Sequence, residues 1–424
     1  MLGVPEVGVS QRHRGTNLPK MGDFNQAVIL DSIRRAEEGL SRVELSGSAG
    51  LAAQTVSNIC RRLLDAELIV EAGKEASGPG KPRTILRLNP KGMFAVGVHI
   101  DPALTSFALV DAVGTVLESL EQPTDLASPP DEAVAAMGRE ILAIIERSGV
   151  DRHRIAGVGV ATPGPIDAAN GTVVDPPHMP GWLRVPLRSI LAEVTGLPVV
   201  MDKDVTAAAV AELWTGSTGG AANLIYVYIG TGIGAGLILG DEVVRGSSGN
   251  VGEIGHIITD PYGPDCDCGS RGCVKVTCMP ETLVAEAREL GVLPAPDPGN
   301  PSTLPQDVTA LADAAADGNV AAADILARSA HRMAGAVSVL TNLLDVEKVV
   351  FGGPLWPALS ATYLAQVPGL LRQRSVTGNV HAVDIAGTRL HPGGGAFGAA
   401  CLVMEKTFSP NAAQLLLDAK PASG

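Results

Sequence analysis

Four residues with metal-binding side chains lie close together in the stretch 249–273, which reads GNVGEIGHIITDPYGPDCDCGSRGC. They are His256, Cys266, Cys268 and Cys273. Three thiolates and one imidazole form the closed tetrahedral ligand set of structural zinc, with no position left open for water. The glycines between them permit the sharp turns that bring three sulfurs onto one ion. The alternative is three reduced cysteines near an unrelated histidine. The pattern predicts one structural zinc ion per chain.

A carboxylate lies beside this predicted metal cluster. Glu253 comes three residues before His256. A metal ion that fixes His256 also fixes Glu253 nearby, so we expect the zinc to support a polar ligand site rather than to take part in catalysis.

The charge of the chain is distributed unevenly. The formal net charge is −13, but residues 1–90 carry 12 Lys and Arg against 10 Asp and Glu, and the remainder carries 20 against 35. A mildly basic first part and an acidic remainder indicate a protein that contacts nucleic acid through its N-terminal part only.

The cysteines and the hydropathy pattern favour the cytoplasm. Three of the six cysteines belong to the zinc cluster, while Cys60, Cys278 and Cys401 are scattered, which indicates a reducing compartment rather than a disulfide framework. Arg12 and Arg14 are not followed by the apolar run of a signal peptide. The long uncharged segment 213–240 contains LIYVYI and many glycines, so we predict a buried hairpin there and no membrane partner.

A small DNA-binding domain is predicted at residues 24–90, after a flexible tail at 1–23. Residues 24–38 have apolar side chains at helical spacing, and Ser41 with Glu44 forms the capping-box pattern of a short second helix. A third helix is predicted at 52–66, followed by strands at 68–73 and 84–89 around the loop KEASGPGKPR. This order of elements is that of a winged helix-turn-helix.

The third predicted helix carries polar side chains opposite its apolar face. Side chains of these types bond to base edges and phosphates in a major groove, and the candidates are Gln54, Thr55, Ser57, Asn58, Arg61 and Arg62. Lys81 and Arg83 in the wing are candidates for a minor groove or for phosphates. The expected partner is double-stranded operator DNA, read by a homodimer or homotetramer because one such head buries too little surface alone. The alternative is an interaction module whose polar face is merely solvated.

Beyond a predicted linker at 89–92, strands alternate with helices, which is typical of an α/β body. Strands are expected at 94–100, 106–114, 115–121, 155–161, 197–202, 223–230, 235–241 and 346–353, and helices at 130–148 and 205–214, with a mainly helical stretch to about 342 and a last helix from about 394. We assign the body to residues 91–405 and a loose tail to residues 406–424.

Several motifs in this order resemble those of the ROK family, which contains repressors and sugar kinases. The matching motifs are TPGPID (162–167), PGW (180–182), the aspartate at 204 with its helix, GTGIGAG (230–236), GEIGH (252–256), the Cys cluster and FGG (351–353). The resemblance covers residues 24–405. It implies a two-lobed, actin-like sugar-kinase body, preceded in the repressors by a winged helix.

The resemblance also implies roles for individual residues. In kinases of the family, the residue matching Asp204 takes the proton from a sugar hydroxyl, and those matching Glu253 and His256 bond sugar hydroxyls. Two glycine loops hold the phosphates of ATP. From the residues alone, Asp204 is equally well explained as a helix N-cap, and GTGIGAG is better explained as a hairpin turn.

The first phosphate loop departs from the kinase pattern D-x-G-G-T. Counting back from ALVD (108–111), the loop falls on His99–Ala103, with His99 at the Asp position and Asp101 and Pro102 at the glycine positions. Pro102 has no N–H to donate and Asp101 repels a triphosphate. We therefore expect no enzyme activity.

The sugar site departs from the family pattern as well. Lys203 and Thr206 stand where the family has Asn, His178 replaces the Asn before PGW, and Lys275 replaces a Glu after the last zinc cysteine. Two of these changes introduce cations, which raises the question of a phosphorylated or acidic sugar. Each lysine is equally well explained as a surface charge.

These observations predict a cytoplasmic, nucleoid-associated repressor whose body senses a sugar or sugar phosphate. The expected effector-binding residues are Pro163, Gly164, His178, Lys203, Asp204, Glu253, His256 and Lys275. One rival hypothesis is an active ATP-dependent sugar kinase with a regulatory DNA-binding head. Another makes the Cys cluster a nucleic-acid-binding finger, which the aspartates around it oppose.

Overall fold

The computed structural model describes residues 18–75, 82–216, 218, 220–296, 303–390 and 394–409. The chain divides into two compact units, one made of Met1–Met93 with Met404–Gly424 and the other of Phe94–Val403. Within the described residues, no helix combines the length and the apolar character needed to cross a membrane.

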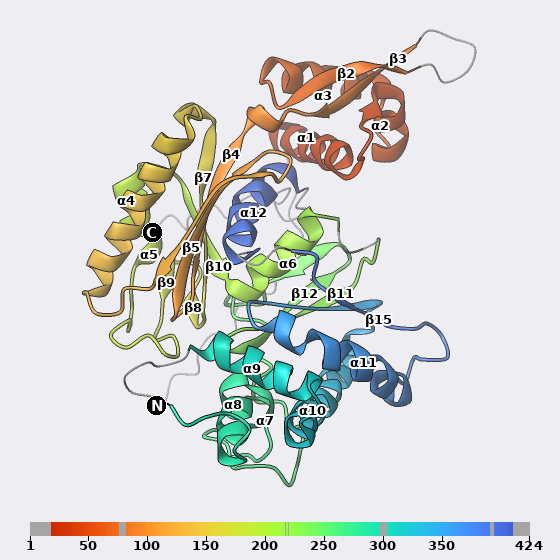
Figure 1. Cartoon of the computed structure of the whole chain (residues 1–424). Coiled ribbons are helices and arrows are strands. Elements are labelled where there is room, and N and C mark those ends of the chain that lie inside the picture. The colour runs from red at the N-terminus through yellow and green to blue at the C-terminus, as the bar shows by residue number, and fades with distance from the viewer. Residues whose placement is uncertain are drawn as a thin grey trace, which may run out of the picture. The chain divides into compact units, whose positions relative to one another are not determined.

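Between residues 18 and 93, the described part of the N-terminal unit contains three helices and a small antiparallel sheet (Figure 1). The helices are α1 (Leu18–Arg35), α2 (Arg42–Ala49) and α3 (Ala53–Asp65). The sheet has the order β1-β3-β2, with β1 at Leu40–Ser41, β2 at Ile69–Glu75 and β3 at Arg83–Leu88. Two predictions need correction. Helix α1 begins within the expected tail and ends three residues before 38, and the sequence reasoning missed β1, which is too short to show a pattern.

Local interactions explain why these helices begin where they do. Ser41 is the N-cap of α2, and its hydroxyl accepts from the backbone of Glu44 while the Glu44 side chain accepts from the backbone of Ser41, as the capping-box pattern predicts. Gly50 ends α2 with φ 63°, the left-handed conformation that glycine adopts at no steric cost. Helix α3 buries Val56, Ile59, Cys60 and Leu63, whereas Leu64 is only partly buried.

The body contains two five-stranded sheets, each with helices on its faces (Figure 1). The first sheet has the order β10-β7-β4-β5-β6, formed by β4 (Phe94–Ile100), β5 (Leu104–Asp111), β6 (Val116–Pro123), β7 (Ile155–Thr162) and β10 (Val199–Lys203). Helices α4 (Pro130–Ser148) and α5 (Leu187–Thr195) pack together against it. A short hairpin, β8 (Ile166–Asp167) and β9 (Thr172–Val173), follows β7, and 3-10 turns lie at Pro90–Gly92 and Arg152–Arg154.

The second sheet has the order β13-β12-β11-β14-β15. Its strands are β11 (Leu224–Ile229), β12 (Ile233–Leu239), β13 (Glu242–Val244), β14 (Lys348–Gly352) and β15 (Asp384–Gly387). A large apolar core joins it to helices α7 (Val274–Cys278), α8 (Pro280–Glu289), α9 (Leu304–Ala316), α10 (Val320–Leu344) and α11 (Trp356–Arg374). The hairpin predicted around GTGIGAG is confirmed, because β11 and β12 pair antiparallel.

Two apolar helices, α6 (Asp204–Trp214) and α12 (Gly394–Phe408), complete the body. Helix α6 contacts strands of both sheets. Helix α12 lies so close to the first sheet that a Cβ at Gly97 would fall 1.8 Å from the carbonyl oxygen of Ala396, and one at Gly159 would fall 1.7 Å from that of Ala399. Glycine is therefore required at both strand positions.

Candidate functional site

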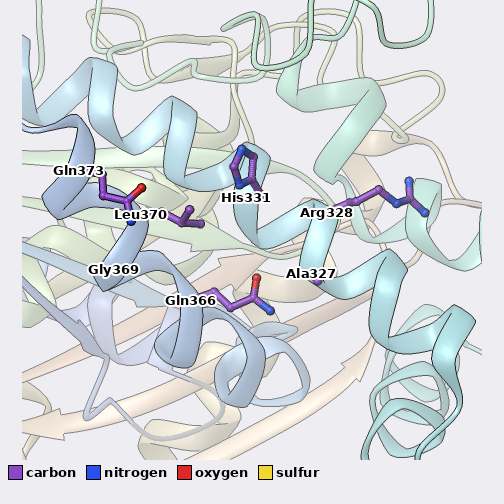
Figure 2. A pocket seen from close by; sticks show the side chains of 7 residues that line it. All are labelled: Ala327, Arg328, His331, Gln366, Gly369, Leu370 and Gln373. Carbon is purple, nitrogen blue, oxygen red and sulfur yellow. The ribbon is translucent and has the colours of Figure 1, made fainter.

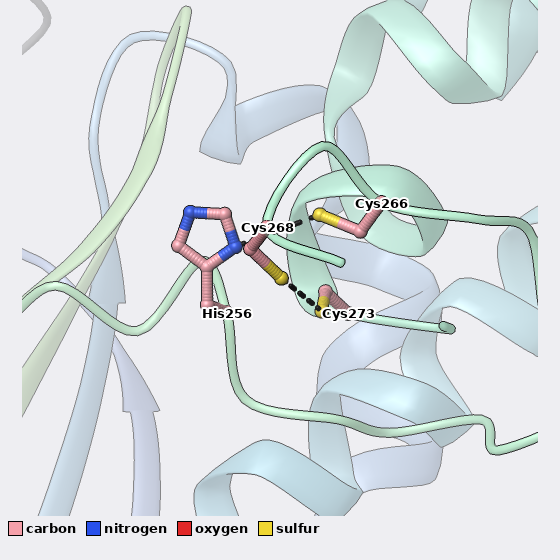
Figure 3. A group of neighbouring side chains, drawn as sticks. All are labelled: His256, Cys266, Cys268 and Cys273. Atoms are coloured by element: carbon pink, nitrogen blue, oxygen red, sulfur yellow. Dashed lines mark hydrogen bonds between the residues drawn. The ribbon is translucent and has the colours of Figure 1, made fainter. Parts of the chain in front are cut away.

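The predicted metal ligands lie together in the structure (Figure 3). The ligand atoms of His256, Cys266, Cys268 and Cys273 all lie within 4.8 Å of one another. The Sγ atoms of Cys268 and Cys273 are 3.7 Å apart, and the Nδ1 atom of His256 is 3.5 Å from the Sγ atom of Cys266. A tetrahedral zinc ion with ordinary bond lengths sets these separations at about 3.8 and about 3.6 Å. The donor set and its dimensions fit a metal ion.

The backbone around the cluster is tightly folded. A Cβ at Gly272 would fall 1.5 Å from the carbonyl oxygen of Asp260, so only glycine allows the two chain segments to meet. The Asp260 carboxylate accepts from Arg332 of α10 at 2.8 Å, which anchors the cluster to the helical layer. Hydrogen bonds from the backbone and side chain of Ser270 lower the pKa of Cys268 to about 6, whereas burial raises the pKa of Cys273 to about 12.

The carboxyl ends of three adjacent parallel strands meet at one edge of the first sheet. Lys203 at the end of β10 pairs in register with Thr162 at the end of β7, and His99 near the end of β4 pairs with Ala161. The segments that begin with Asp101, Pro163 and Asp204 therefore start from the same edge, which is where ligands bind in open α/β sheets.

Lys203, at the end of β10 in the first sheet, contacts the segment that follows β13 of the second sheet. Its ammonium group donates to the Glu253 carboxylate and, at 3.3 Å, to the carbonyl oxygen of Val251. Its stem packs on Gly164, where a Cβ would come within 2.9 Å of the Lys203 Cε atom. Asn250 holds the same loop, because its side chain accepts from the backbone N–H of Ile166 and donates to its carbonyl, both at 2.7 Å.

Asp204 is the first residue of α6, so the N-cap is Lys203 and the N-cap explanation of Asp204 is wrong. Its carboxylate accepts from the backbone N–H of Val205 at 2.7 Å. Burial raises the pKa of Asp204 to about 6, and the neighbouring carboxylates of Glu253 and Asp101 act in the same direction, opposed by Val205 and Lys203. A partly buried carboxyl that titrates near neutrality can exchange a proton with a hydroxyl.

The turn after β4 is hydrogen-bonded to the glycine loop between β11 and β12 of the second sheet. Thr231 donates its hydroxyl to the Asp101 carboxylate at 2.9 Å, and the other carboxylate oxygen of Asp101 accepts from the N–H of Ala103, also at 2.9 Å. His99 is buried against Gly395, where a Cβ would fall 2.4 Å from its Nδ1 atom, and burial lowers its pKa. The imidazole is therefore neutral at physiological pH.

Sequence reasoning missed three members of this site. Asn250 carries no motif signal of its own, although it precedes GEIGH by two residues. Asp202 pairs with Arg245 at 2.6 Å, a contact between residues that are distant in sequence. Tyr228 is buried beside Gly230, and its hydroxyl has no hydrogen-bond partner within the described residues. Its LIYVYI context indicated only a buried strand.

The remaining predicted effector residues are not in the group of contacts around Lys203 or have other partners. Pro163 begins the loop that includes Gly164, and His178 is exposed in a turn with φ 62°. His256 is held in the Cys cluster. Lys275 donates to Asp267 at 2.5 Å, beside the cluster, so its ammonium is paired there. The structure thus groups Gly164, Lys203, Asp204 and Glu253, while their role in effector binding stays a prediction.

Four of the six predicted DNA-binding residues of α3 are exposed. Gln54 donates to Asn58 at 3.2 Å, and Arg61 and Arg62 are exposed, whereas Thr55 and Ser57 are half-buried. In the wing, Arg83 lies 4.0 Å from Glu44, and Lys81 falls outside the described residues.

A groove of about 500 Å³ lies elsewhere on the body, between α10 and α11 (Figure 2). Arg328 at its rim is paired with Glu286 and Asp324, and His331 contacts Arg374 through its Nε2 atom at 2.8 Å. None of the residues that sequence analysis selected lines this groove, which is formed by Ala327, Arg328, His331, Gln366, Gly369, Leu370 and Gln373.

The known proteins that are similar in sequence to this chain include transcriptional repressors and sugar kinases. The chain is 25% identical to the xylose repressor of Caldicellulosiruptor bescii, covering 91% of this chain and 96% of that protein. It is 27% identical to the DNA-binding transcriptional repressor Mlc of Escherichia coli, covering 89% and 95%. The glucokinase of Thermotoga maritima is 28% identical but covers 73% of this chain and 97% of its own length.

A solved structure that resembles this chain is also that of a transcriptional regulator. The crystal structure of a ROK family transcriptional regulator, described as a homologue of the Escherichia coli Mlc protein, superposes with a TM-score of 0.77 at 25% identity and covers 94% of this chain and 99% of its own. The family model for ROK matches residues 95–406, which include both sheets and the Cys cluster. The chain belongs to the ROK family.

Proposed function

We propose that this ROK protein is a transcriptional repressor that binds operator DNA through residues 24–90 and senses a carbohydrate through its body. The order of α1, α2, α3, β2 and β3 is that of a winged helix-turn-helix, whose third helix enters the major groove. The alignments with repressors extend over about nine tenths of the chain, whereas that with the glucokinase extends over about three quarters, which favours the repressor function.

The observation that carries this proposal is the exposed polar side of α3. Gln54 and Asn58 lie one turn apart and can bond to base edges, and among the described residues no acidic side chain pairs with Arg61 or Arg62. Unpaired arginines on the same helix are available for DNA phosphates, which position a protein on the duplex.

Effector sensing would use the contacts between the lobes. Glu253 and the Gly164 loop meet at Lys203, so a ligand that contacts them bears on both lobes. A sugar that binds one arrangement of the lobes more tightly shifts the population toward it, and the arrangement that holds the DNA-binding heads in register has the higher operator affinity.

The metal ion proposed for the Cys cluster is a structural zinc, one per chain. Three thiolates and an imidazole leave no open coordination position, so the ion would hold the fold of residues 256–273 and take no part in a reaction. Because His256 and Glu253 share one segment, the ion would also fix the position of the effector site.

Selection of bound sequences from a random DNA pool tests this function, followed by affinity measurements with and without a panel of sugars. We expect a motif with two-fold symmetry, bound by a homodimer or homotetramer in the cytoplasm at the nucleoid, and a sugar-dependent change in affinity. Recovery of no two-fold motif would remove the DNA-binding assignment.

A sugar kinase is the second candidate, because Asp204 has the raised pKa of about 6 that suits a catalytic base. The turn after β4 opposes it. Pro102 has no N–H, the N–H of Ala103 is used by Asp101, and the Asp101 carboxylate lies on Thr231 of the glycine loop. We expect no sugar-dependent ADP release in a coupled assay, and robust turnover would replace the repressor-only function.

A further inference from the structure

We infer that the Cys cluster is a peroxide-sensitive switch, in which oxidation joins Cys268 to Cys273 as a disulfide and releases the metal ion. This inference rests on the structural zinc proposed above and gives its ligands a second, regulatory role. Three features of the cluster point to it: one exposed thiol, a second thiol directly beside the first, and backbone hydrogen bonds from the cluster to the segment that follows Glu253.

The three thiols differ in their access to solvent. Cys266 and Cys273 are buried, with 7% and 0% of their surface exposed, whereas Cys268 is exposed. Cys268 is followed by Gly269, where an added Cβ would meet no atom within 4 Å, so the turn is open on this side. A metal-bound cysteine is already a thiolate, which is the form that a peroxide attacks. A small oxidant in water can therefore reach the Cys268 sulfur without any unfolding of the chain.

Cys273 is placed to complete the disulfide (Figure 3). Its Sγ atom lies 3.7 Å from that of Cys268. A disulfide bond is about 2.0 Å long, so the two sulfurs must approach each other by less than about 2 Å. Cys273 is held at the start of α7, where Thr277 donates its hydroxyl to the Cys273 carbonyl oxygen at 2.8 Å. The open turn that carries Cys268 is therefore the part that moves.

The reaction is a two-electron oxidation by hydrogen peroxide. The Cys268 thiolate attacks one peroxide oxygen, the O–O bond breaks, and a sulfenic acid forms while hydroxide leaves. The Cys273 thiolate then attacks the sulfenic sulfur, forms the S–S bond and expels a second hydroxide. Two thiolates and two protons thus reduce one peroxide molecule to two waters. One thiolate and one imidazole remain, which are too few ligands for a closed tetrahedral site, so the metal ion is released.

Oxidation of the cluster affects the segment that follows Glu253. Two backbone hydrogen bonds join residues 255–257 to the chain just after Cys273, from the N–H of Val274 to the carbonyl oxygen of Ile257 at 2.9 Å and from the N–H of Lys275 to that of Gly255 at 2.8 Å. His256 lies within this segment and loses its metal ion when the cluster is oxidised. The segment is then held from one side only, so the position of Glu253, two residues before it, becomes less defined.

Titration of the full-length protein with hydrogen peroxide tests the inference. Zinc is followed with a colorimetric chelator, and mass spectrometry identifies the cysteines that become linked. We expect the release of one zinc ion per chain together with one disulfide between Cys268 and Cys273, and the recovery of both thiols and zinc binding after treatment with dithiothreitol and added zinc. Amide hydrogen exchange of a peptide that covers residues 250–258 should become faster as the zinc is released.

Two variants separate the switch from general oxidation. Cys268→His removes the exposed thiol and keeps four ligands as a Cys2His2 set, which also binds structural zinc. It should retain its zinc in peroxide at least about tenfold longer than the parent protein. Cys278→Ala removes a buried cysteine that lies just beyond the cluster in sequence, and it should release zinc at the rate of the parent protein.

The outcomes separate the switch from the structural zinc. If the purified protein holds no zinc, the structural zinc and the switch are both wrong. If zinc is present but stays bound in peroxide, leaves without a disulfide between Cys268 and Cys273, or leaves Cys268→His as fast as the parent protein, the switch is overturned and the structural zinc stands. If Cys268→His binds no zinc, the disulfide and the zinc release of the parent protein and of Cys278→Ala decide.

Discussion

Removing either partner of the Lys203–Glu253 pair should have unequal effects on stability. Only 3% of the Lys203 side chain is exposed, against 67% of that of Glu253. The Glu253→Gln change leaves a buried ammonium whose other acceptor is the Val251 carbonyl, at 3.3 Å. The Lys203→Met change removes the buried charge, keeps a stem of similar volume against Gly164 and leaves Glu253 hydrated.

The exposed fractions of the two side chains determine how much stability each variant should lose. Breaking a buried ion pair from one side costs about 3–5 kcal/mol, and the exposure of Glu253 reduces this through solvent screening, so we expect about 2 kcal/mol for Glu253→Gln. Replacing the lysine by an apolar residue of similar volume should cost less than about 1 kcal/mol. At about 2 °C per kcal/mol for a body of this size, the Tm should fall by about 4 °C in the first variant and by less than about 2 °C in the second.

Thermal unfolding of the parent, both single variants and the double variant measures this difference. Because Lys203→Met removes the charge that Glu253 compensates, the double variant should be no less stable than the Lys203→Met single variant. If Lys203→Met destabilises as much as Glu253→Gln, or the two effects simply add, the assignment of a buried, compensated charge is wrong.

Three further predictions concern the Cys cluster, α3 and Asp204. Cys268→Ser should lose the bound zinc and lower the Tm, whereas the control Cys60→Ser in the N-terminal unit should retain the metal. A colorimetric assay measures the zinc content of both variants. An unchanged zinc content in Cys268→Ser would contradict the assignment of Cys268 as a ligand. Asn58→Ala should relax base preference, while Arg61→Ala should weaken binding to all sequences and lower the salt slope by about one, with Arg147→Ala on α4 as a control. Burial raises the pKa of Asp204 to about 6, so the folded state binds its proton more tightly than the unfolded state and stability is lost as pH rises through that value. Asp204→Asn should therefore raise the Tm at about pH 8 and change it little near about pH 4, and equal shifts at both values would falsify this account.

Local patterns made several elements predictable. The helix predicted at 130–148 is α4, and the Ser41–Glu44 cap begins α2 as expected, because both depend on residues within a few positions of each other. Helix α11 was missed because Pro368 and Gly369 interrupt its sequence, although the tertiary packing of Tyr363 and Val367 maintains it. The edge strand β15 was missed because it is short and only partly buried.

The candidate site was predictable in its members but not in its pairings. The four metal ligands lie within one short stretch, so their spacing reveals the cluster. Lys203 and Glu253 are fifty residues apart, and nothing in either motif indicates that the lysine is neutralised by the very carboxylate expected to bind the ligand. From the sequence, Lys203 and Lys275 are two possible sources of positive charge, and only the fold shows that each is paired with a carboxylate.

The glycines beneath α12 have a mechanical consequence. At Gly97 and Gly159 the helix backbone rests on the strand backbone, so no layer of side chains can change rotamer to absorb a shift between them. The first sheet and α12 must then move as one rigid block. Polar contacts link the first sheet to the second sheet and its loops, among them Thr231 with Asp101, Asn250 with Ile166, and Lys203 with Glu253. Apolar side chains of α6 also pack on the second sheet. The polar contacts can exchange with water, whereas α6 must either stay on the second sheet or lose apolar packing, so this helix decides where the body can open.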